Sequence, residues 1–215
     1  VRAQRAQSQR ARRKSQLPQI SLVGYTNTGK STLFNRLTKA MVFVANQPFA
    51  TLDPSIRRLP LSDGPIAILA DTVGFIRHLP HHLVVAFRAT LEETQQADLL
   101  LHVVDATNTE KNECNQAVNN VLKQIHTDHI KQLIVVNKID LLENTPPRLE
   151  RNAVGLPTKV WISAHSGIGI DLLSKAIIEC LAYQANNETP HLLKNHHTQV
   201  CPFDPKPGDN DALMN

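Results

Sequence analysis

Short apolar runs recur along the chain, and each ends at a polar residue or at a glycine. Five of them have the length of a strand, at residues 20–23, 66–70, 99–104, 133–136 and 160–162, and residues 56–59 are a sixth, brief strand candidate. Most of these runs do not alternate with polar positions, which is typical of strands buried on both faces. The pattern therefore predicts a mostly parallel sheet in the interior of the protein.

Segments with helical spacing lie between the strands. The spacing predicts helices over residues 30–39, 83–96, 108–125 and 169–183. Residues 40–54 contain Pro48 and Pro54 without a clear period, and we interpret them as a loop. Alternating strands and helices over about 165 residues predict an α/β fold, with helices on both faces of the sheet.

The two ends of the chain differ from the middle. Residues 1–17 lack large apolar residues until Leu17, and we interpret them as the end of a basic helical linker stopped by Pro18. Residues 18–184 form the predicted globular domain. Residues 185–215 are polar and contain four prolines, which predicts a mobile tail without a core. Because the first residue is Val1, we expect a piece of a longer protein.

Composition narrows the class of protein. The chain has 215 residues, of which 41% are hydrophobic and 20% are charged, so wholesale disorder is excluded. No apolar run approaches the roughly 18 residues that span a bilayer. The three cysteines lie far apart, which argues against a disulfide framework and favours a cytoplasmic location. We expect a monomer without an integral membrane segment.

The net charge of +4 is unevenly distributed. Residues 1–14 carry six of the 23 basic residues and no acid, so 17 basic residues face 19 acidic ones in the remainder. Such an arm fits a polyanionic partner, and a solvated helix end explains it equally well. The charge pattern alone leaves both interpretations open.

A phosphate-binding motif follows the first predicted strand. Gly24-Tyr25-Thr26-Asn27-Thr28-Gly29-Lys30-Ser31 matches G-x-x-x-x-G-K-[ST] at the start of a predicted helix. Its backbone N–H groups and the helix N-terminus would surround a polyphosphate. Lys30 would reach the β- and γ-phosphates, and Ser31 would bind Mg²⁺. We predict that this loop and the following Thr32 bind a nucleotide.

Asp71-Thr72-Val73-Gly74 comes at the end of the third predicted strand, 40 residues after Ser31. Its position predicts that Asp71 holds Mg²⁺ through water and that the Gly74 N–H binds the γ-phosphate. Thr51 is the best candidate for a second hydroxyl on Mg²⁺, although a turn beside Asp53-Pro54 is the alternative. We expect Lys30, Thr51 and Gly74 to take part in catalysis.

Two later motifs are candidates for recognising the base. In Asn137-Lys138-Ile139-Asp140, the carboxylate can accept hydrogen bonds from N1–H and the 2-amino group of guanine, which adenine lacks. Asn137 would brace the loop, and the Lys138 stem would lie on the base. In Ser163-Ala164-His165, the Ala164 N–H would face guanine O6. Asp105 ends a predicted strand, and we interpret it as a cap of the next helix.

With these motifs in order, the chain resembles the HflX family of translation-factor-related GTPases. The similar stretches are residues 24–35, 71–84, 86–93 and 97–106. The resemblance implies a six-stranded GTPase domain with one antiparallel strand, preceded by an N-terminal domain and a helical linker. It also implies GTP hydrolysis to GDP and phosphate, binding to the large ribosomal subunit and its RNA, and splitting of stalled ribosomes. We expect no DNA partner.

Alternatives remain at two levels. The protein is either an enzyme that hydrolyses GTP, slowly without a partner, or a ribosome-binding switch in which hydrolysis is only a slow timer. A small-molecule kinase is a third option, but the guanine-reading pair Asn137 and Asp140 argues against it. Asn27 stands where some relatives of this class hold K⁺, and a purely loop-shaping role is the alternative. Phe75 occupies the position where many GTPases have glutamine, which predicts slow hydrolysis by the isolated domain.

Overall fold

A computed structural model of the chain describes residues 17–40, 55–61, 64–72, 74 and 94–192. Several sequence predictions lie outside the described residues: the basic arm up to residue 16, Thr51, Phe75, most of the helix expected at 83–96, and the tail beyond residue 192.

One seven-stranded sheet organises the described residues, in the order β2-β3-β1-β4-β5-β7-β6. The strands are β1 (Gln19–Val23), β2 (Ser55–Pro60), β3 (Ile66–Asp71), β4 (Leu99–Asp105), β5 (Lys131–Asn137), β6 (Arg148–Arg151) and β7 (Pro157–Trp161). The five inner strands run parallel, whereas β2 and β6 pair antiparallel at the two edges. The predicted α/β fold with a mostly parallel sheet is confirmed.

The predicted number of strands was wrong by one. The sheet holds seven strands in place of six, and two of them are antiparallel where one was expected. The missed strand is β6, which forms a hairpin with β7 and has no fully buried position. Because the strand is an exposed edge with the sequence Arg-Leu-Glu-Arg, it lacks the apolar run that marked the others.

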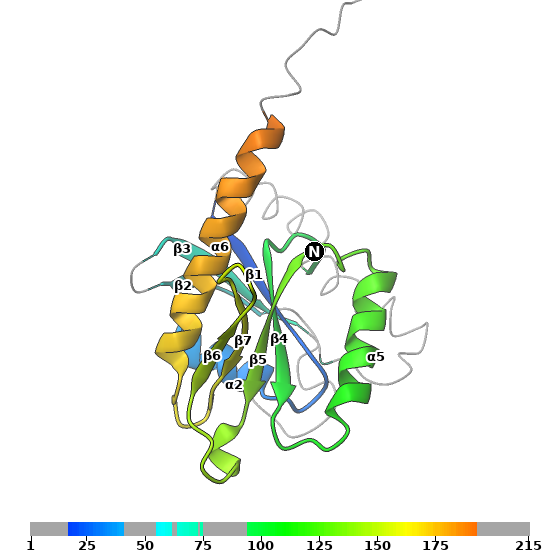
Figure 1. Cartoon of the computed structure of the whole chain (residues 1–215), viewed down its shortest axis with the longest axis vertical. Coiled ribbons are helices and arrows are strands. Elements are labelled where there is room, and N and C mark those ends of the chain that lie inside the picture. Colours follow the sequence, from blue (N-terminus) through cyan, green and yellow to red (C-terminus); the bar gives the residue numbers. More distant parts are fainter. Residues whose placement is uncertain (1–16, 41–54, 62–63, 73, 75–93, 193–215) are drawn as a thin grey trace, which may run out of the picture.

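Helices cover both faces of this sheet (Figure 1). They are α2 (Lys30–Thr38), α5 (Lys111–Gln124) and α6 (Ile170–Leu192), and a short 3₁₀ helix, η1, spans Ile139–Leu141. In Figure 1, α5 lies to one side of the strands and α6 to the other. The helix α6 continues nine residues beyond the predicted end at Tyr183, and it passes through Pro190 close to its last residue.

Each helix is anchored by an apolar stripe with helical spacing. In α6 the buried residues are Leu173, Ala176, Ile177, Cys180 and Leu181, which join the larger core with α2 and the sheet. The smaller core on the opposite face combines α5 with Val23 and Leu100. In the part of the chain that the structure describes, no helix is long and apolar enough to cross a membrane.

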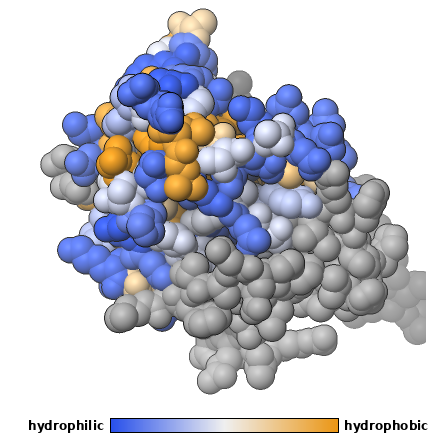
Figure 2. Space-filling view, turned by 90° about the horizontal axis from the view of Figure 1, so that it is seen from below, coloured by the Kyte–Doolittle hydropathy of each residue, from blue (hydrophilic) through white to orange (hydrophobic). Residues whose placement is uncertain are grey.

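The parallel arrangement sets the position of the candidate site. The loops after β1, β3, β5 and β7 leave the sheet at the carboxyl ends of parallel strands, at the lower end of Figure 1. Ligands of open α/β sheets bind outside this edge. Figure 2 looks onto this end and shows a largely hydrophilic surface with one hydrophobic patch.

Candidate functional site: a nucleotide-binding edge

Buried polar side chains concentrate at the loops on this edge. Ten buried polar or charged residues are found among those described, and six of them belong to the four predicted motifs: Thr28, Lys30, Asp71, Thr72, Asn137 and Ser163. A buried polar group is stable only when it is hydrogen-bonded or paired. The concentration therefore indicates a built polar site and not an incidental surface.

The phosphate loop has a shape that only glycine permits at two positions. Gly24 and Gly29 have φ angles of 151° and 93°. A Cβ on Gly24 would lie 2.4 Å from the Val103 carbonyl oxygen, and one on Gly29 would lie 2.4 Å from Asn137 Nδ2. Asn27 is exposed at the tip with a φ of 60°, in the left-handed region that asparagine tolerates. Because the two glycines have no Cβ, the loop can approach Val103 and Asn137 this closely.

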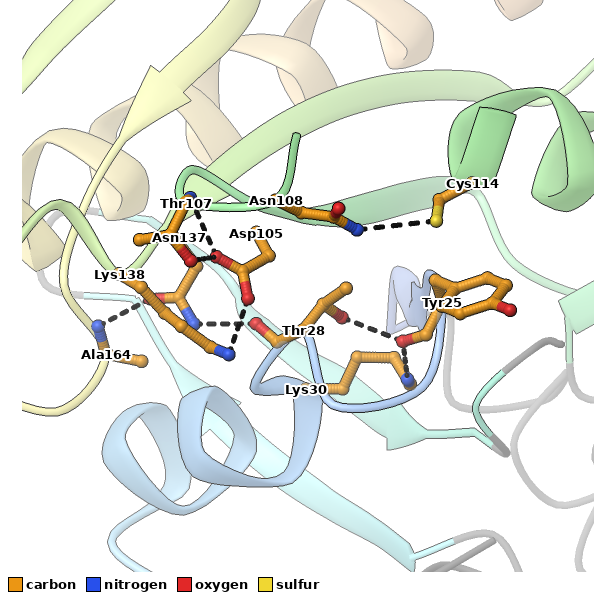
Figure 3. Close-up of polar contacts among 10 residues, drawn as sticks. All are labelled: Tyr25, Thr28, Lys30, Asp105, Thr107, Asn108, Cys114, Asn137, Lys138 and Ala164. Carbon is orange, nitrogen blue, oxygen red and sulfur yellow. Dashed lines mark hydrogen bonds and ion pairs between the residues drawn. The ribbon is translucent and has the colours of Figure 1, made fainter. Parts of the chain in front are cut away.

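Lys30 begins α2, and its ammonium lies over the phosphate loop (Figure 3). Its Nζ donates to the carbonyl oxygens of Gly24, at 3.2 Å, and Tyr25, at 2.9 Å. Burial lowers the pKa of Lys30 to about 8, although the negative charge of Asp71 opposes that shift. The desolvated ammonium and the N-terminus of α2 both attract negative charge. Lys30 is therefore well placed to bind an anion.

The second motif meets the phosphate loop at Lys30. Asp71 is fully buried at the end of β3, where it interacts electrostatically with Lys30. Thr72 continues the β1–β3 pairing through its hydroxyl, which donates to the Leu22 carbonyl. A Cβ on Gly74 would lie 2.8 Å from Thr26 Cγ2 and 3.2 Å from Lys30 Nζ. The structure thus brings Asp71 and Gly74 to the phosphate loop.

The residues present fit a magnesium ion. Ser31 lies in the first turn of α2, and Asp71 supplies a buried carboxylate at the neighbouring strand end. Hydroxyl and carboxylate oxygens are the ligands that Mg²⁺ prefers. Among the described residues, no cluster of three or more His, Cys, Asp or Glu side chains suggests a metal site of another type.

Asn137 connects three of the loops (Figure 3). Its Nδ2 donates to the Thr28 carbonyl at 2.9 Å, and its Oδ1 accepts from the Ala164 N–H, also at 2.9 Å. The predicted bracing role of Asn137 therefore has a structural basis. The Ala164 N–H, which is predicted to face guanine O6, donates to Asn137 in this structure.

Lys138 and Asp140 extend beyond this brace. Lys138 has a φ of 70°, and its Nζ lies 2.6 Å from Asp105 Oδ2. Asp140 sits in η1 with an exposed side chain, as a residue that contacts a ligand requires. Asp105 does not cap α5, which begins at Lys111. It instead pairs with Lys138 and accepts from the Thr107 N–H and hydroxyl, at 2.9 and 2.7 Å.

Sequence reasoning missed one further contact to the Ser163-Ala164-His165 loop, called the SAH loop below. Arg36 of α2 donates from Nε to the Ala164 carbonyl at 3.0 Å and from Nη2 to the His165 carbonyl. A cavity of about 610 Å³ lies beside it, lined by Thr32, Asn35, Arg36, Lys39, Ala164 and His165. Three of these lining residues are predicted nucleotide ligands. The cavity therefore lies between α2 and the SAH loop.

Together these loops define a P-loop GTPase domain: a phosphate loop after β1, an aspartate after β3, and base-reading loops after β5 and β7. Residues 19–138 match a family model described as "50S ribosome-binding GTPase", and the chain belongs to this family. Within that class, it is 52% identical over 192 residues to the GTPase HflX of Escherichia coli (strain K12). This match confirms the predicted resemblance to HflX proteins.

The alignment covers 89% of this chain but only 45% of the E. coli protein, so the chain spans less than half the length of that relative. A solved GTP-binding protein from Sulfolobus solfataricus in complex with GDP has a TM-score of 0.60 and 28% identity, covering 85% of this chain and 58% of that one. NFeoB from S. thermophilus bound to GDP.AlF4- and K⁺ has a TM-score of 0.55 and 27% identity, covering 74% and 60%.

Proposed function

We propose that this chain binds GTP with Mg²⁺ and hydrolyses it to GDP and phosphate. The convergence of four motif loops at one sheet edge, three of them connected by Asn137, is the observation that supports it most strongly. A phosphate loop alone would suit many nucleotides. The base loop after β5 adds a carboxylate that matches guanine and not adenine.

The roles of the phosphate-side residues follow from their positions. The backbone of Gly24, Tyr25, Thr26, Asn27, Thr28 and Gly29, with Ser31 and Thr32, surrounds the phosphates. The Lys30 ammonium leaves its carbonyl partners for the β- and γ-phosphate oxygens, where its charge is neutralised more completely. Ser31 and Asp71 would hold Mg²⁺ together with Thr51, the ligand that the sequence alone proposes, and the ion would neutralise charge on the phosphate oxygens. Gly74 donates its N–H to the γ-phosphate.

The base is recognised at the neighbouring loops. Asp140 accepts from guanine N1–H and the 2-amino group, and the Lys138 stem lies on the base face. Asn137 keeps the base loop at the phosphate loop, and Ser163, Ala164 and His165 border the other side. The Ser163 hydroxyl supports this turn by accepting from the Ser166 N–H at 3.0 Å.

Two further features concern the rate. With Phe75 where a water-orienting glutamine would stand, the chain has electrostatic stabilisation but lacks that side chain, so the isolated domain hydrolyses GTP slowly. Asn27 has two open roles. A K⁺ ion beside it would offset negative charge on the phosphates, and NFeoB with bound K⁺ supports that role; shaping of the exposed loop tip by Asn27 is the alternative.

We propose the large ribosomal subunit and its RNA as the partner of the whole protein, and splitting of stalled ribosomes as its task. The family description and the HflX relatives support this partner. Action on ribosomes agrees with the cytoplasmic location and monomeric state expected from the sequence.

Phosphate release tests the activity. The full chain is incubated with GTP or ATP at equal Mg²⁺, with and without purified large subunits. We expect slow, GTP-specific release that rises when subunits are added, and almost none from Lys30→Ala. Equal turnover of ATP and GTP would reject the guanine assignment. Fast turnover by the chain alone would mean that an unnamed group orients the attacking water.

A further inference from the structure

The Ala164–His165 segment is held from two sides. The Ala164 N–H donates to Asn137 Oδ1 at 2.9 Å, and its carbonyl accepts from Arg36 Nε at 3.0 Å. The next carbonyl, that of His165, accepts from Arg36 Nη2. The planar guanidinium thus bonds two successive carbonyls through two N–H groups whose relative directions are fixed.

These contacts provide one of two connections between the phosphate loop and the SAH loop. Arg36 lies six residues after Lys30, about 9 Å along the same helix. Leu33 and Phe34 are fully buried between them, which fixes the rotation of α2 against the sheet. Asn137 makes the second connection, from the phosphate loop at Thr28 to Ala164. The SAH loop is therefore attached to the phosphate loop through both α2 and Asn137.

The SAH loop is also closed by bonds of its own backbone, in which the Gly167 N–H donates to the Ser163 carbonyl and the Ser163 N–H donates to the Ile168 carbonyl, both at 2.9 Å. Ser166 and Gly167 turn it, with Gly167 at a φ of 88°, and His165 is exposed. A Cβ at position 167 would make an ordinary van der Waals contact with the guanidinium, at 3.7 Å from Arg36 Cζ, so the loop packs beside Arg36 without a clash. Loss of the arginine would leave two carbonyls exposed to water, so the loop would lose stiffness while the fold persists.

We propose that Arg36 is a positioning residue that sets how long a guanine nucleotide stays bound, by holding the SAH loop against the base. This inference rests on the proposed function, because it requires a guanine at the base loops. Arg36 reaches the site through the SAH carbonyls and not through the phosphates, so it should affect release and leave the chemical step unchanged.

The test measures release and chemistry separately on the full chain. Dissociation of a fluorescent GDP analogue is followed after addition of excess GDP, and hydrolysis of prebound GTP is followed in a single turnover. In Arg36→Ala we expect dissociation to be faster by about tenfold, as the loss of two charged hydrogen bonds at a partly exposed site predicts. Single-turnover hydrolysis should stay within about twofold of the wild type.

Three comparisons separate positioning from a general effect. Lys39→Gln removes an equal charge from the same cavity wall, and it should leave release unchanged. Arg36→Lys keeps the positive charge but lacks the fixed pair of N–H groups of the guanidinium, so it should give an intermediate rate, and it serves if the alanine variant fails to fold. Displacement of bound GDP by inorganic tripolyphosphate reports on the phosphate side, and the affinity for tripolyphosphate should be the same in every variant.

The outcomes are distinguishable from those of the proposed function. If the wild type binds GDP and both Arg36 variants release it at the wild-type rate, the inference is overturned and the guanine site stands. An equal acceleration by Lys39→Gln would overturn it as well, because charge alone would then explain the effect. A wild type that binds no guanine nucleotide would reject the proposed function, and the inference with it.

Discussion

At the scale of single residues, Asp140 carries the choice of base. Its exposed carboxylate follows the braced Asn137, in position to accept two hydrogen bonds from guanine. In Asp140→Asn the amide presents a donor where guanine also donates. The binding free energy of GTP should therefore weaken by about 2–4 kcal/mol, and the variant should bind xanthosine triphosphate instead. Competition binding with the two nucleotides measures this exchange. Unchanged GTP affinity in the variant would end the guanine assignment.

Lys30 predicts a pH dependence of nucleotide binding. Burial lowers its pKa to about 8, against an ordinary value of 10.5. Between these values the unfolded chain keeps the proton and the folded chain releases it, so this group stabilises the fold as pH rises through that window. Bound phosphates favour the charged form and raise the pKa again. Nucleotide binding above pH 8 must therefore take up a proton, and affinity should fall by up to tenfold per pH unit.

The measurement compares GDP affinity of the wild type and Lys30→Arg between pH 7 and 9. The arginine stays charged throughout, so it corrects for titration of the nucleotide itself. We expect the wild type to weaken relative to Lys30→Arg only above about pH 8. A constant ratio of the two affinities would show that Lys30 remains charged in the free protein.

Asp105 supports Lys138 and makes a second pH prediction. Burial opposes ionisation of its carboxyl, but Lys138 and the two donors of Thr107 outweigh that effect and hold its pKa below the ordinary value. Such a group stabilises the fold above its unfolded pKa of about 3.9, and this stability is lost as pH falls through the folded pKa. Asp105→Asn should therefore cost about 1 kcal/mol near neutral pH.

Thermal unfolding of Asp105→Asn and wild type from pH 3 to 7 tests this. The difference in Tm should be constant above about pH 5 and shrink as pH falls below about 4, because the carboxyl of the unfolded wild type takes up its proton before that of the folded state. A difference that persists at the lowest pH would mean that the Lys138 ion pair contributes nothing to it.

The sequence could identify the residues that are predicted to touch the nucleotide, because each belongs to a short motif with a fixed chemical purpose. It could not reveal the residues that hold them. Arg36 and its carbonyl partners are 128 and 129 residues apart, and Asp105 is 33 residues from Lys138. No local pattern records a contact that only the folded sheet creates. The bond between Asn137 and the Ala164 N–H, 27 residues apart, is a contact of the same kind.

At the scale of elements, the inner strands were predictable because burial on both faces demands continuous apolar runs. The edge strand β6 was not, since its side chains are partly or fully exposed. Trp161 of β7 gives its indole N–H to Glu150 at 2.9 Å and lies under the Arg148 guanidinium, at 3.5 Å from the ring centre. These contacts across the hairpin stabilise the pair without an apolar signature.

The end of α6 was misplaced for a different reason. Proline normally stops a helix because it lacks an N–H and clashes with the preceding turn. Pro190 was therefore assigned to the tail, yet the backbone stays helical to Leu192. Only two residues follow the proline, so the helix loses at most its final bonds. A proline near a helix end thus marks the boundary only to within a turn.

The phosphate loop as an element gives the potassium prediction. Asn27 lies exposed at its tip with a φ of 60°, where its side chain is available to a cation or to the loop itself. A monovalent cation there would offset the negative charge that grows on the β–γ bridge oxygen. Replacing K⁺ by Na⁺ at equal ionic strength should then slow single-turnover hydrolysis, and Asn27→Ala should abolish the difference. Equal rates in the two salts would leave Asn27 with the loop-shaping role alone.

At the scale of the whole molecule, the two faces of the sheet carry separate cores that hold different helices. The larger core holds α2 and α6 against one face and thereby fixes the helix that begins at Lys30. The smaller core holds α5 on the other face, and Tyr25 of the phosphate loop packs against it. The phosphate loop is thus anchored to both cores. A substitution that disturbs the packing of either core should therefore change nucleotide affinity.

The basic arm is the part of the molecule best suited to an RNA partner. Its six cations, Arg2, Arg5, Arg10, Arg12, Arg13 and Lys14, precede the sheet and belong to no motif of the nucleotide site. If they contact ribosomal RNA phosphates, each contact should add roughly 0.7 to 0.9 to the slope of log affinity against log salt concentration. Deleting residues 1–14 should weaken binding to large subunits and flatten that slope, while GDP affinity stays the same.

Subunit binding at several salt concentrations, with GDP binding measured in parallel, distinguishes the two interpretations of the arm. An equal loss of GDP affinity would mean that the arm belongs to the fold, and an unchanged slope would mean that its charges only keep it solvated.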